Sequence, residues 1–246
     1  MKIIISPAKK MIENLETLYQ PSIPIFINQA EEIRNFLKRQ NYDQLKLIWN
    51  CSDSIVTENI ERLHSLSLDK NLTPALFSYD GIQYKNISPN VFTLEAIEYV
   101  NKHLFIISAL YGVLRPLDGV IPYRLEMQAQ IKLNSEQSLY TYWGDKIYNF
   151  INEDEIIINL ASKEYSKVIE PYIKNENQMI TCIFACLKND KLVQKATEAK
   201  SCRGSMVRYL AMNLIEDIEG IKKFQAYNYH YSSRHSTKNT LVFIKE

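Results

Sequence analysis

Polar and basic side chains directly follow three apolar segments of the chain, and their types suit the binding of an anionic group. These stretches are Ser6-Pro7-Ala8-Lys9, then 111–127 with Arg115, Asp118, Arg124 and Glu126, and finally 159–165 with Ser162, Lys163 and Glu164. Open α/β sheets bind ligands at the carboxyl ends of their strands. Lys and Arg beside the free N–H groups of a helix start suit a phosphate, and the stretch 200–204 is expected to open a late helix.

The same residues are also compatible with a purely structural role. The arginines and acids of 111–127 could form a buried ion-pair network, since clusters of charge mark functional sites only statistically. Cys202, next to Arg203 at the expected helix start, could have a lowered pKa and react as a thiolate. No partner base accompanies it in the sequence, so both interpretations stay open.

Hydrophobic periodicity predicts the elements that would position these residues. Apolar residues recur at helical spacing over 30–39, 42–49, 53–66, 89–102, 140–150, 162–169 and 203–215. Ser52 or Asp53 is expected to cap the helix over 53–66, and Ser88 or Asn90 the helix over 89–102. Continuous apolar runs predict buried strands over 2–6, 104–110, 156–160 and 179–185. Alternating residues predict an antiparallel pair over 226–231 and 240–244.

Together these elements predict a mixed α/β (α+β) fold, with a mixed sheet flanked by helices. Buried strands interleaved with helices imply a sheet covered on both faces, and the C-terminal strands add an antiparallel part. The six glycines and eight prolines mark no linker or repeat, so we expect a single compact domain over residues 1–246. The helices over 42–49 and 53–66 are expected to form a helical hairpin.

Composition limits the functional classes. Lys plus Arg is 29 and Asp plus Glu is 28, so a nucleic-acid-binding surface would have to be concentrated locally. No apolar stretch is long enough for a membrane span, and the run 3–5 is too short for a signal-peptide core. We therefore expect a cytoplasmic protein with no membrane partner, whose four cysteines are reduced thiols.

We expect no cofactor and no metal site. The sequence contains no phosphate-binding loop, dinucleotide fingerprint, zinc-protease motif or nucleophile elbow. Cys182 and Cys186 lack a second pair of Cys or His at zinc spacing, and they lie in an apolar, strand-like run. His230 and His235 have no carboxylate pattern nearby that would suggest a catalytic relay.

Seven segments carry a resemblance that runs nearly from end to end. They are ISPAK (5–9), YDGxxY (79–84), SALYGVLRPLDGVIPYRLEM (108–127), LYTYWGDKI (139–147), INLASKEY (158–165), AKSCRGSMVRYLAMN (199–213) and LVF (241–243). In these segments the chain resembles the YaaA family of bacterial peroxide-stress proteins. The resemblance implies a cytosolic protein that helps bacteria survive hydrogen peroxide by limiting free iron and DNA damage. It also implies a compact α/β fold with a positively charged cleft, a helix-hairpin-helix element and binding of double-stranded DNA.

The strand ends and the resemblance together define the expected site. Residues expected to bind nucleic acid are Lys9, Arg115, Arg124, Lys163, Lys200, Arg203 and Arg208. Residues expected to line the cleft are Ser6, Tyr84, Tyr111, Asp118, Glu126, Asp145, Ser162 and Glu164. By the resemblance, a second Lys is usual at Ser201 and an aromatic residue at Glu198, so this chain should attract phosphate less strongly there. The hairpin over 42–63 would be the helix-hairpin-helix element, although its turn, 50–53, has no glycine.

Three functions remain open. The first is a protective protein, expected as a monomer, that binds double-stranded or distorted DNA mainly through phosphates; Arg115→Ala or Arg203→Ala would then weaken binding uniformly. The second is an enzyme acting on a nucleotide or a damaged base, because acids, tyrosines and basic residues would share one cleft. The third is direct handling of iron or haem, for which the sequence offers no dense cluster of His, Cys and carboxylates.

Overall fold

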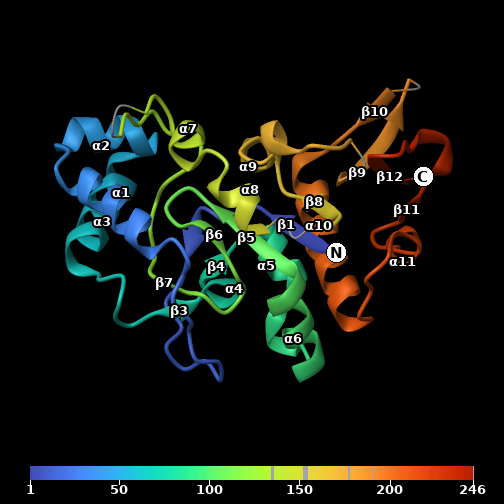
Figure 1. Ribbon diagram of the computed structural model, residues 1–246, viewed down its shortest axis with the longest axis horizontal. Coiled ribbons are helices and arrows are strands. Elements are labelled where there is room, and N and C mark those ends of the chain that lie inside the picture. The colour runs from blue at the N-terminus through green and yellow to red at the C-terminus, as the bar shows by residue number, and fades with distance from the viewer. Residues whose placement is uncertain (134–135, 152–154, 177, 190, 246) are drawn as a thin grey trace.

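An eight-stranded sheet runs through the middle of the protein (Figure 1). The computed structural model describes residues 1–133, 136–151, 155–176, 178–189 and 191–245. The strands follow the order β11-β12-β9-β8-β1-β5-β6, and β10 pairs with β9. Their bounds are β1 Lys2–Ile5, β5 Leu104–Ser108, β6 Gly112–Leu114, β8 Ile157–Leu160, β9 Met179–Lys188, β10 Lys191–Val193, β11 Tyr229–Tyr231 and β12 Thr240–Lys245. Short strands form two further pairs, which are β2 (Lys10–Met11) with β4 (Tyr79–Asp80) and β3 (Thr73–Pro74) with β7 (Gly119–Val120).

The sheet is mixed, which confirms the predicted fold class. β1 pairs in parallel with β5 on one side and with β8 on the other, and β9 and β12 continue the parallel part. β6, β10 and β11 each pair antiparallel with a neighbouring strand. All residues of β1, β5 and β8 are buried. Burial on both faces explains why these strands read as continuous apolar runs.

Helices cover the sheet, and a further group of helices lies at one end of the molecule. α1, α2 and α3 gather at the end of the molecule opposite the C-terminal strands (Figure 1), and α5 packs against α10. The bounds are α1 Ile27–Lys38, α2 Tyr42–Trp49, α3 Asp53–Ser65, α4 Ala75–Ser78, α5 Ile82–Ile87, α6 Leu94–His103, α7 Leu139–Trp143, α8 Lys146–Ile151, α9 Lys163–Ser166, α10 Ala196–Met212 and α11 Ile218–Lys222.

The expected helical hairpin is present as α2 and α3. Asn41 caps α2, since its side chain accepts from the Gln44 N–H while the Gln44 side chain accepts from the Asn41 N–H. Asn50 ends α2 in the left-handed conformation, with a φ of 42°. Asparagine tolerates this conformation at a helix end, where glycine is more usual. The chain can therefore turn directly into α3, whose N-cap residue is Ser52.

Several predicted helices have different bounds in the structure: the one expected over 162–169 is shorter, as α9, and the one expected over 203–215 begins earlier, as α10. Two others differ for a local reason. The helix expected over 140–150 is divided at Gly144, whose φ of 50° cannot continue a helix. The helix expected over 89–102 begins later, at α6, where the Thr93 hydroxyl accepts from the Ala96 N–H at 3.2 Å. Thr93 is therefore the N-cap, because a threonine oxygen satisfies an N–H group that the helix leaves free.

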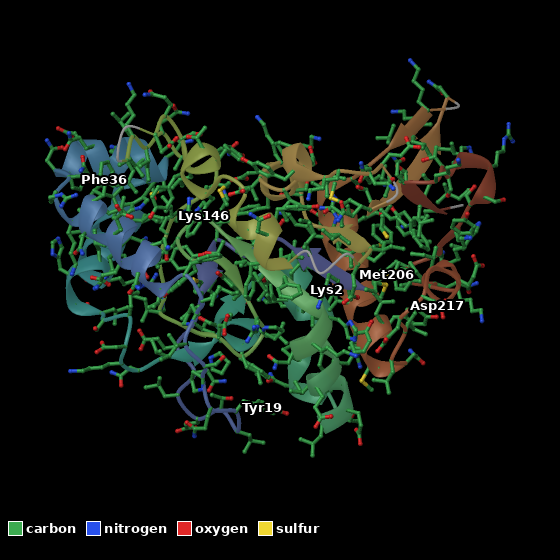
Figure 2. All side chains as sticks on the ribbon, in the orientation of Figure 1. Lys2, Tyr19, Phe36, Lys146, Met206 and Asp217 are labelled. Atoms are coloured by element: carbon green, nitrogen blue, oxygen red, sulfur yellow. The ribbon has the colours of Figure 1, made fainter. Side chains whose placement is uncertain are left out.

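One buried core joins the two ends of the chain. Its side chains reach from Ile3 in β1 to Phe243 in β12, and Tyr111 and Met206 are fully buried within it. In Figure 2, Met206 lies on α10 among other side chains, whereas Tyr19 lies on a loop at the edge of the molecule. No helix in the described ranges is both long and apolar enough to cross a membrane.

Candidate functional site

Two neighbouring parallel strands end side by side at the candidate site. Ile5 and Leu160 are register partners in β1 and β8, so the residues that follow them lie at the same edge of the sheet. The Ser162 backbone N–H donates to Ser6 Oγ at 2.8 Å. The Ser6 hydroxyl in turn donates to Ser162 Oγ at 3.2 Å. The ends of the two strands thus bring Ser6 and Ser162 into contact.

The segment from β4 to α5 packs over these strand ends and forms the next wall. The Tyr84 hydroxyl donates to the Ser6 carbonyl at 2.9 Å. Lys10 and Asp80 are register partners in β2 and β4, and their charged groups lie 2.7 Å apart. The hydrogen bond and the strand pair together fix the segment after β1 against the start of α5.

A chain of hydroxyl groups attaches the loop after β7 to the same edge. The Tyr123 hydroxyl lies 2.7 Å from Ser108 Oγ and 2.8 Å from the Tyr79 hydroxyl. Ser108 is the last residue of β5 and Tyr79 the first of β4, so two elements hold Tyr123 in place. The residues that follow, 124–126, therefore reach the ends of the parallel strands.

These segments enclose a cavity of about 400 Å³, which lies within the size range of small-molecule sites. We call it the strand-end cavity. It is lined by Ser6, Pro7, Ala8, Lys9, Lys10, Asp80, Gly81, Ile82, Gln83, Tyr84, Tyr123, Arg124, Leu125, Glu126, Ser162, Glu164, Tyr165, Lys200 and Arg203.

Five cations and three carboxylates line the strand-end cavity, and the carboxylates do not neutralise the cations evenly. Glu126 Oε1 lies 2.7 Å from Lys9 Nζ and 3.1 Å from a guanidinium nitrogen of Arg124. By contrast, the side chains of Lys200 and Arg203 make no hydrogen bond or ion pair within the part of the chain that the structure describes. Two cations therefore remain free to bind an anion that enters the cavity.

Glu164 has surroundings unlike those of Glu126. It is half-buried, its Oε1 accepts from the Gln128 N–H at 3.4 Å, and no ion pair involves it among the described residues. Burial raises the pKa of Glu164 above its ordinary value, and the negative charge of Glu126 adds to the rise. Burial also raises the pKa of Tyr123 to about 12, so that its hydroxyl stays protonated at neutral pH.

Lys200 and Arg203 lie inside α10 rather than at its start. The helix begins at Ala196, about one turn before Lys200 and two turns before Arg203, because Ala, Glu and Lys favour helix even on an exposed stretch. Only the first four N–H groups of a helix are free, so those of 200–204 cannot bind a phosphate. The expected helix-start site is therefore wrong. The side chains at 200 and 203 still share one face of α10, because residues three apart are neighbours on a helix.

The thiols of the chain are not activated in the way that the sequence suggested for Cys202. Cys202 lies within α10, and burial raises its pKa to about 12, which corrects the expectation of a reactive thiolate at a helix start. Burial likewise raises the pKa of Cys182 to about 12. All four cysteines are free thiols.

The strand-end cavity brings together nine of the fifteen residues expected at the site. Four were expected to bind nucleic acid and five to line a cleft, and they are Lys9, Arg124, Lys200, Arg203, Ser6, Tyr84, Glu126, Ser162 and Glu164. The other six lie elsewhere. Their positions follow from a reversal of the chain after β5 and from the faces of two helices.

Three of the six lie in the segment that follows β5. β6 runs antiparallel to β5, so Arg115, directly after β6, is carried away from the edge that holds Ser6. Arg115 is exposed, and its guanidinium carbon lies 5.4 Å from the centre of the Phe150 ring. Tyr111 is fully buried in the turn between the two strands. Asp118 is also buried, and its carboxylate accepts from the Arg115 N–H at 2.8 Å, which closes the turn after β6.

The other three are exposed outside the strand-end cavity. Lys163 begins α9 and pairs with Glu170 at 2.6 Å. Arg208 follows Arg203 by five residues on α10, which turns its side chain about 140° away around the helix. Asp145 lies on the surface just before α8.

Asp80, which the sequence placed in the cleft only as one of the acids of the possible enzyme, also lines the strand-end cavity. Four other polar lining residues were not expected at the site, and they are Lys10, Gln83, Tyr123 and Tyr165. Tyr123 and Tyr165 lie in segments that carry the family resemblance, so the motifs themselves were the available signal. Lys10 could not be found in that way, because only the pairing of β2 with β4 brings it to the site.

Glu198 anchors the first turn of α10 to the C-terminal strands. Its carboxylate lies 3.1 Å from Lys195 Nζ and 3.2 Å from Lys245 Nζ, and accepts from the Tyr229 hydroxyl at 2.9 Å. Two ammonium groups therefore offset its charge. This pairing lessens the repulsion of phosphate that the sequence led us to expect from an acid at this position.

A dependence of stability on pH follows from these contacts. Lys195 first, then Tyr229 and Lys245, hold the pKa of Glu198 down to about 2, against 4.5 for an ordinary glutamate. A carboxyl whose pKa is lower in the folded state stabilises the fold only while it is ionised. Glu198→Gln should therefore lower the Tm near neutral pH, and its difference from the wild type should vanish as the pH falls from 4.5 through 2.

Thermal melts followed by circular dichroism across this pH range measure the effect. Glu98→Gln, which changes an exposed glutamate on α6, is the control and should leave the Tm unchanged at every pH. A difference between Glu198→Gln and the wild type that persists undiminished in acid would contradict the expectation.

Comparison with known proteins identifies relatives over the whole length of the chain. A family model described as "Peroxide stress protein YaaA" matches residues 1–235. A UPF0246 protein of Ligilactobacillus salivarius is 50% identical over 246 residues, which is the full length of both chains. A UPF0246 protein of Lachnoclostridium phytofermentans is 46% identical over all of this chain and 96% of its own. One of Lactiplantibacillus plantarum is 43% identical over 99% of each chain.

Proposed function

Because the chain belongs to the family of the peroxide stress protein YaaA, we propose that it is a cytosolic peroxide-stress protein that binds DNA at the strand-end cavity. One observation carries the proposal. Lys200 and Arg203 line the cavity without a carboxylate partner among the described residues. Unpaired cations that line an open cavity suit the phosphates of a nucleic-acid backbone.

The size of the strand-end cavity limits how DNA binds. At about 400 Å³ it has the volume of a small-molecule site. In this proposal the protein binds as a monomer and the duplex lies across the mouth of the strand-end cavity. One phosphate or one displaced nucleotide enters the cavity. DNA with a bubble or another local distortion is therefore bound at least as well as a regular duplex, because an unpaired nucleotide is cheaper to displace.

The helical hairpin of α2 and α3 extends the same interface. A second, smaller hollow is lined by Trp49 of α2 and Leu63 of α3 on one side and by residues 121–125 on the other. The hairpin thus borders the loop after β7, which forms one wall of the strand-end cavity. In this proposal the hairpin is the helix-hairpin-helix element of the family and adds backbone contacts beside the cavity. Limitation of iron-dependent oxidative damage follows from the shielding of the bound DNA.

The dependence of binding on salt tests this proposal. Two phosphate contacts release enough counterions to lower the affinity roughly tenfold between about 50 and 200 mM salt. The measurement is a mobility-shift titration of duplex, bubble and single-stranded DNA at several salt concentrations, and affinity should vary little with base sequence. Absence of salt-sensitive binding to all three forms would rule the proposal out.

A second function is favoured by a separate observation. The strand-end cavity holds two carboxyl groups, of Glu126 and Glu164, in different surroundings. Phosphate binding requires no carboxylate, whereas acid–base catalysis commonly uses a pair of them. The alternative function is therefore an enzyme that acts on a nucleotide or a damaged base in the same cavity.

A further inference from the structure

Two carboxyl groups that line the strand-end cavity have different kinds of partner. Glu126 accepts from the Lys9 ammonium and the Arg124 guanidinium, so it lies in an ion-pair network. Glu164 instead accepts from a backbone N–H, that of Gln128, two residues beyond Glu126, and makes no ion pair with any residue that the structure describes. The two side chains approach the cavity from different elements, the loop after β7 and the start of α9.

These surroundings suit two different catalytic roles. The Glu126 carboxylate is held by two cations at the cavity wall, where it can accept a proton or stabilise a developing positive charge. Burial and the charge of Glu126 raise the pKa of Glu164, so this group keeps its proton to higher pH than an exposed glutamate. Glu126 lies in an ion-pair network, whereas Glu164 is half-buried without an ion pair among the described residues, and general acid–base catalysis commonly uses two carboxyls in such different surroundings.

We propose that the strand-end cavity hydrolyses the N-glycosidic bond of a nucleotide, with Glu164 as general acid and Glu126 as general base. The proposal rests on the function proposed above, and it specifies which bond the alternative enzyme would break. Lys200 and Arg203 hold the phosphate of the nucleotide, because they are the lining cations left without a carboxylate among the described residues. The phosphate fixes the sugar and base between the two carboxyls.

The reaction balances with water as the only co-reactant. Glu164 gives its proton to the leaving base as the bond between the sugar anomeric carbon and the base nitrogen breaks. Glu126 takes a proton from water, and the resulting hydroxide adds to the anomeric carbon. The products are a free base and a sugar phosphate with a new hydroxyl group. Proton exchange with solvent restores both glutamates. The transition state carries positive charge on the sugar, which the Glu126 carboxylate stabilises.

Release of free base by the full chain tests the proposal. Nucleoside monophosphates and a single-stranded oligonucleotide with an oxidised guanine are incubated in heavy-oxygen water, and products are separated by liquid chromatography with mass detection. The expected result is free base, with the heavy oxygen on the sugar. Glu164→Gln and Glu126→Gln should each lower the rate by about 100-fold or more. Glu98→Gln on α6 should leave it unchanged.

The outcomes separate this inference from DNA binding. If the wild type binds DNA in the mobility shift but releases no base from any probe, the inference fails and DNA binding stands. If base is released but Glu164→Gln keeps the full rate, the acid is assigned wrongly and the inference also fails. The pH profile gives a readout that needs no variant: the rate should fall on the alkaline side as Glu164 loses its proton. A flat profile would overturn the role of Glu164.

Discussion

Replacement of Gly204 by alanine is expected to lower the free energy of unfolding by about 3 kcal/mol, although alanine is the better helix former. Gly204 lies where α10 crosses α5, and a Cβ atom there would lie 2.1 Å from the Gln83 carbonyl oxygen and 2.8 Å from Asn86 Cβ. The closest of these atoms belongs to the backbone, which cannot rotate away as a side-chain end can. The gain of roughly 1 kcal/mol in helix propensity is therefore outweighed.

Urea denaturation of the wild type and Gly204→Ala measures this effect. Ser205→Ala, one residue along the same helix, is the matched control and should change the stability by less than about 0.5 kcal/mol. A Gly204→Ala protein as stable as the wild type would show that α5 can move away from α10. Such a movement would also shift Tyr84, and with it the wall of the strand-end cavity.

Arg203→Ala is expected to weaken DNA binding about 10- to 100-fold without lowering the Tm, since a hydrogen bond to a charged group contributes about 1.5–3 kcal/mol. Arg203 is half-buried, its Nε is buried without a partner among the described residues, and burial lowers its pKa. A cation held in this way costs folding free energy, so its removal should leave stability unchanged or improve it. Loss of affinity without loss of stability marks a residue kept for binding.

Two other arginines make this expectation specific. Arg115→Ala, which the sequence alone led us to expect to weaken binding, should change the affinity less than twofold, since Arg115 lies over Phe150 away from the cavity. Arg234→Ala, an exposed arginine near the C-terminus, is the control. The slope of log affinity against log salt concentration should fall by the equivalent of about one phosphate contact in Arg203→Ala and in neither of the other two variants. Equal losses for Arg115→Ala and Arg203→Ala would point to a diffuse basic surface instead.

The cations of the cavity illustrate how far residue types can predict a site. Lys9, Arg124, Lys200 and Arg203 were all expected at the site, and all four line the cavity. The sequence could not distinguish among them, because the distances that join Lys9 and Arg124 to Glu126 exist only in the folded chain. The fold therefore decides that Lys200 and Arg203 are the two cations left without a carboxylate partner among the described residues.

Local patterns determined much of the architecture before any coordinates were considered. Continuous apolar residues in β1, β5 and β8 predicted buried strands, because such strands are covered on both faces. Helical spacing predicted α2 and its hairpin with α3, since the signal lies within a few residues of the element that it describes. The segments that resemble the YaaA family likewise identified the family that the comparisons show.

Only the tertiary structure decided which strand ends meet. A polar residue after an apolar run does not reveal whether the chain continues beyond the sheet or turns back along it. Ser6 and Ser162 meet because β1 and β8 are parallel neighbours, whereas Arg115 is carried away because β6 reverses direction after β5. Strand order and direction depend on packing between residues far apart in the chain, and no local pattern of residue types contains that information.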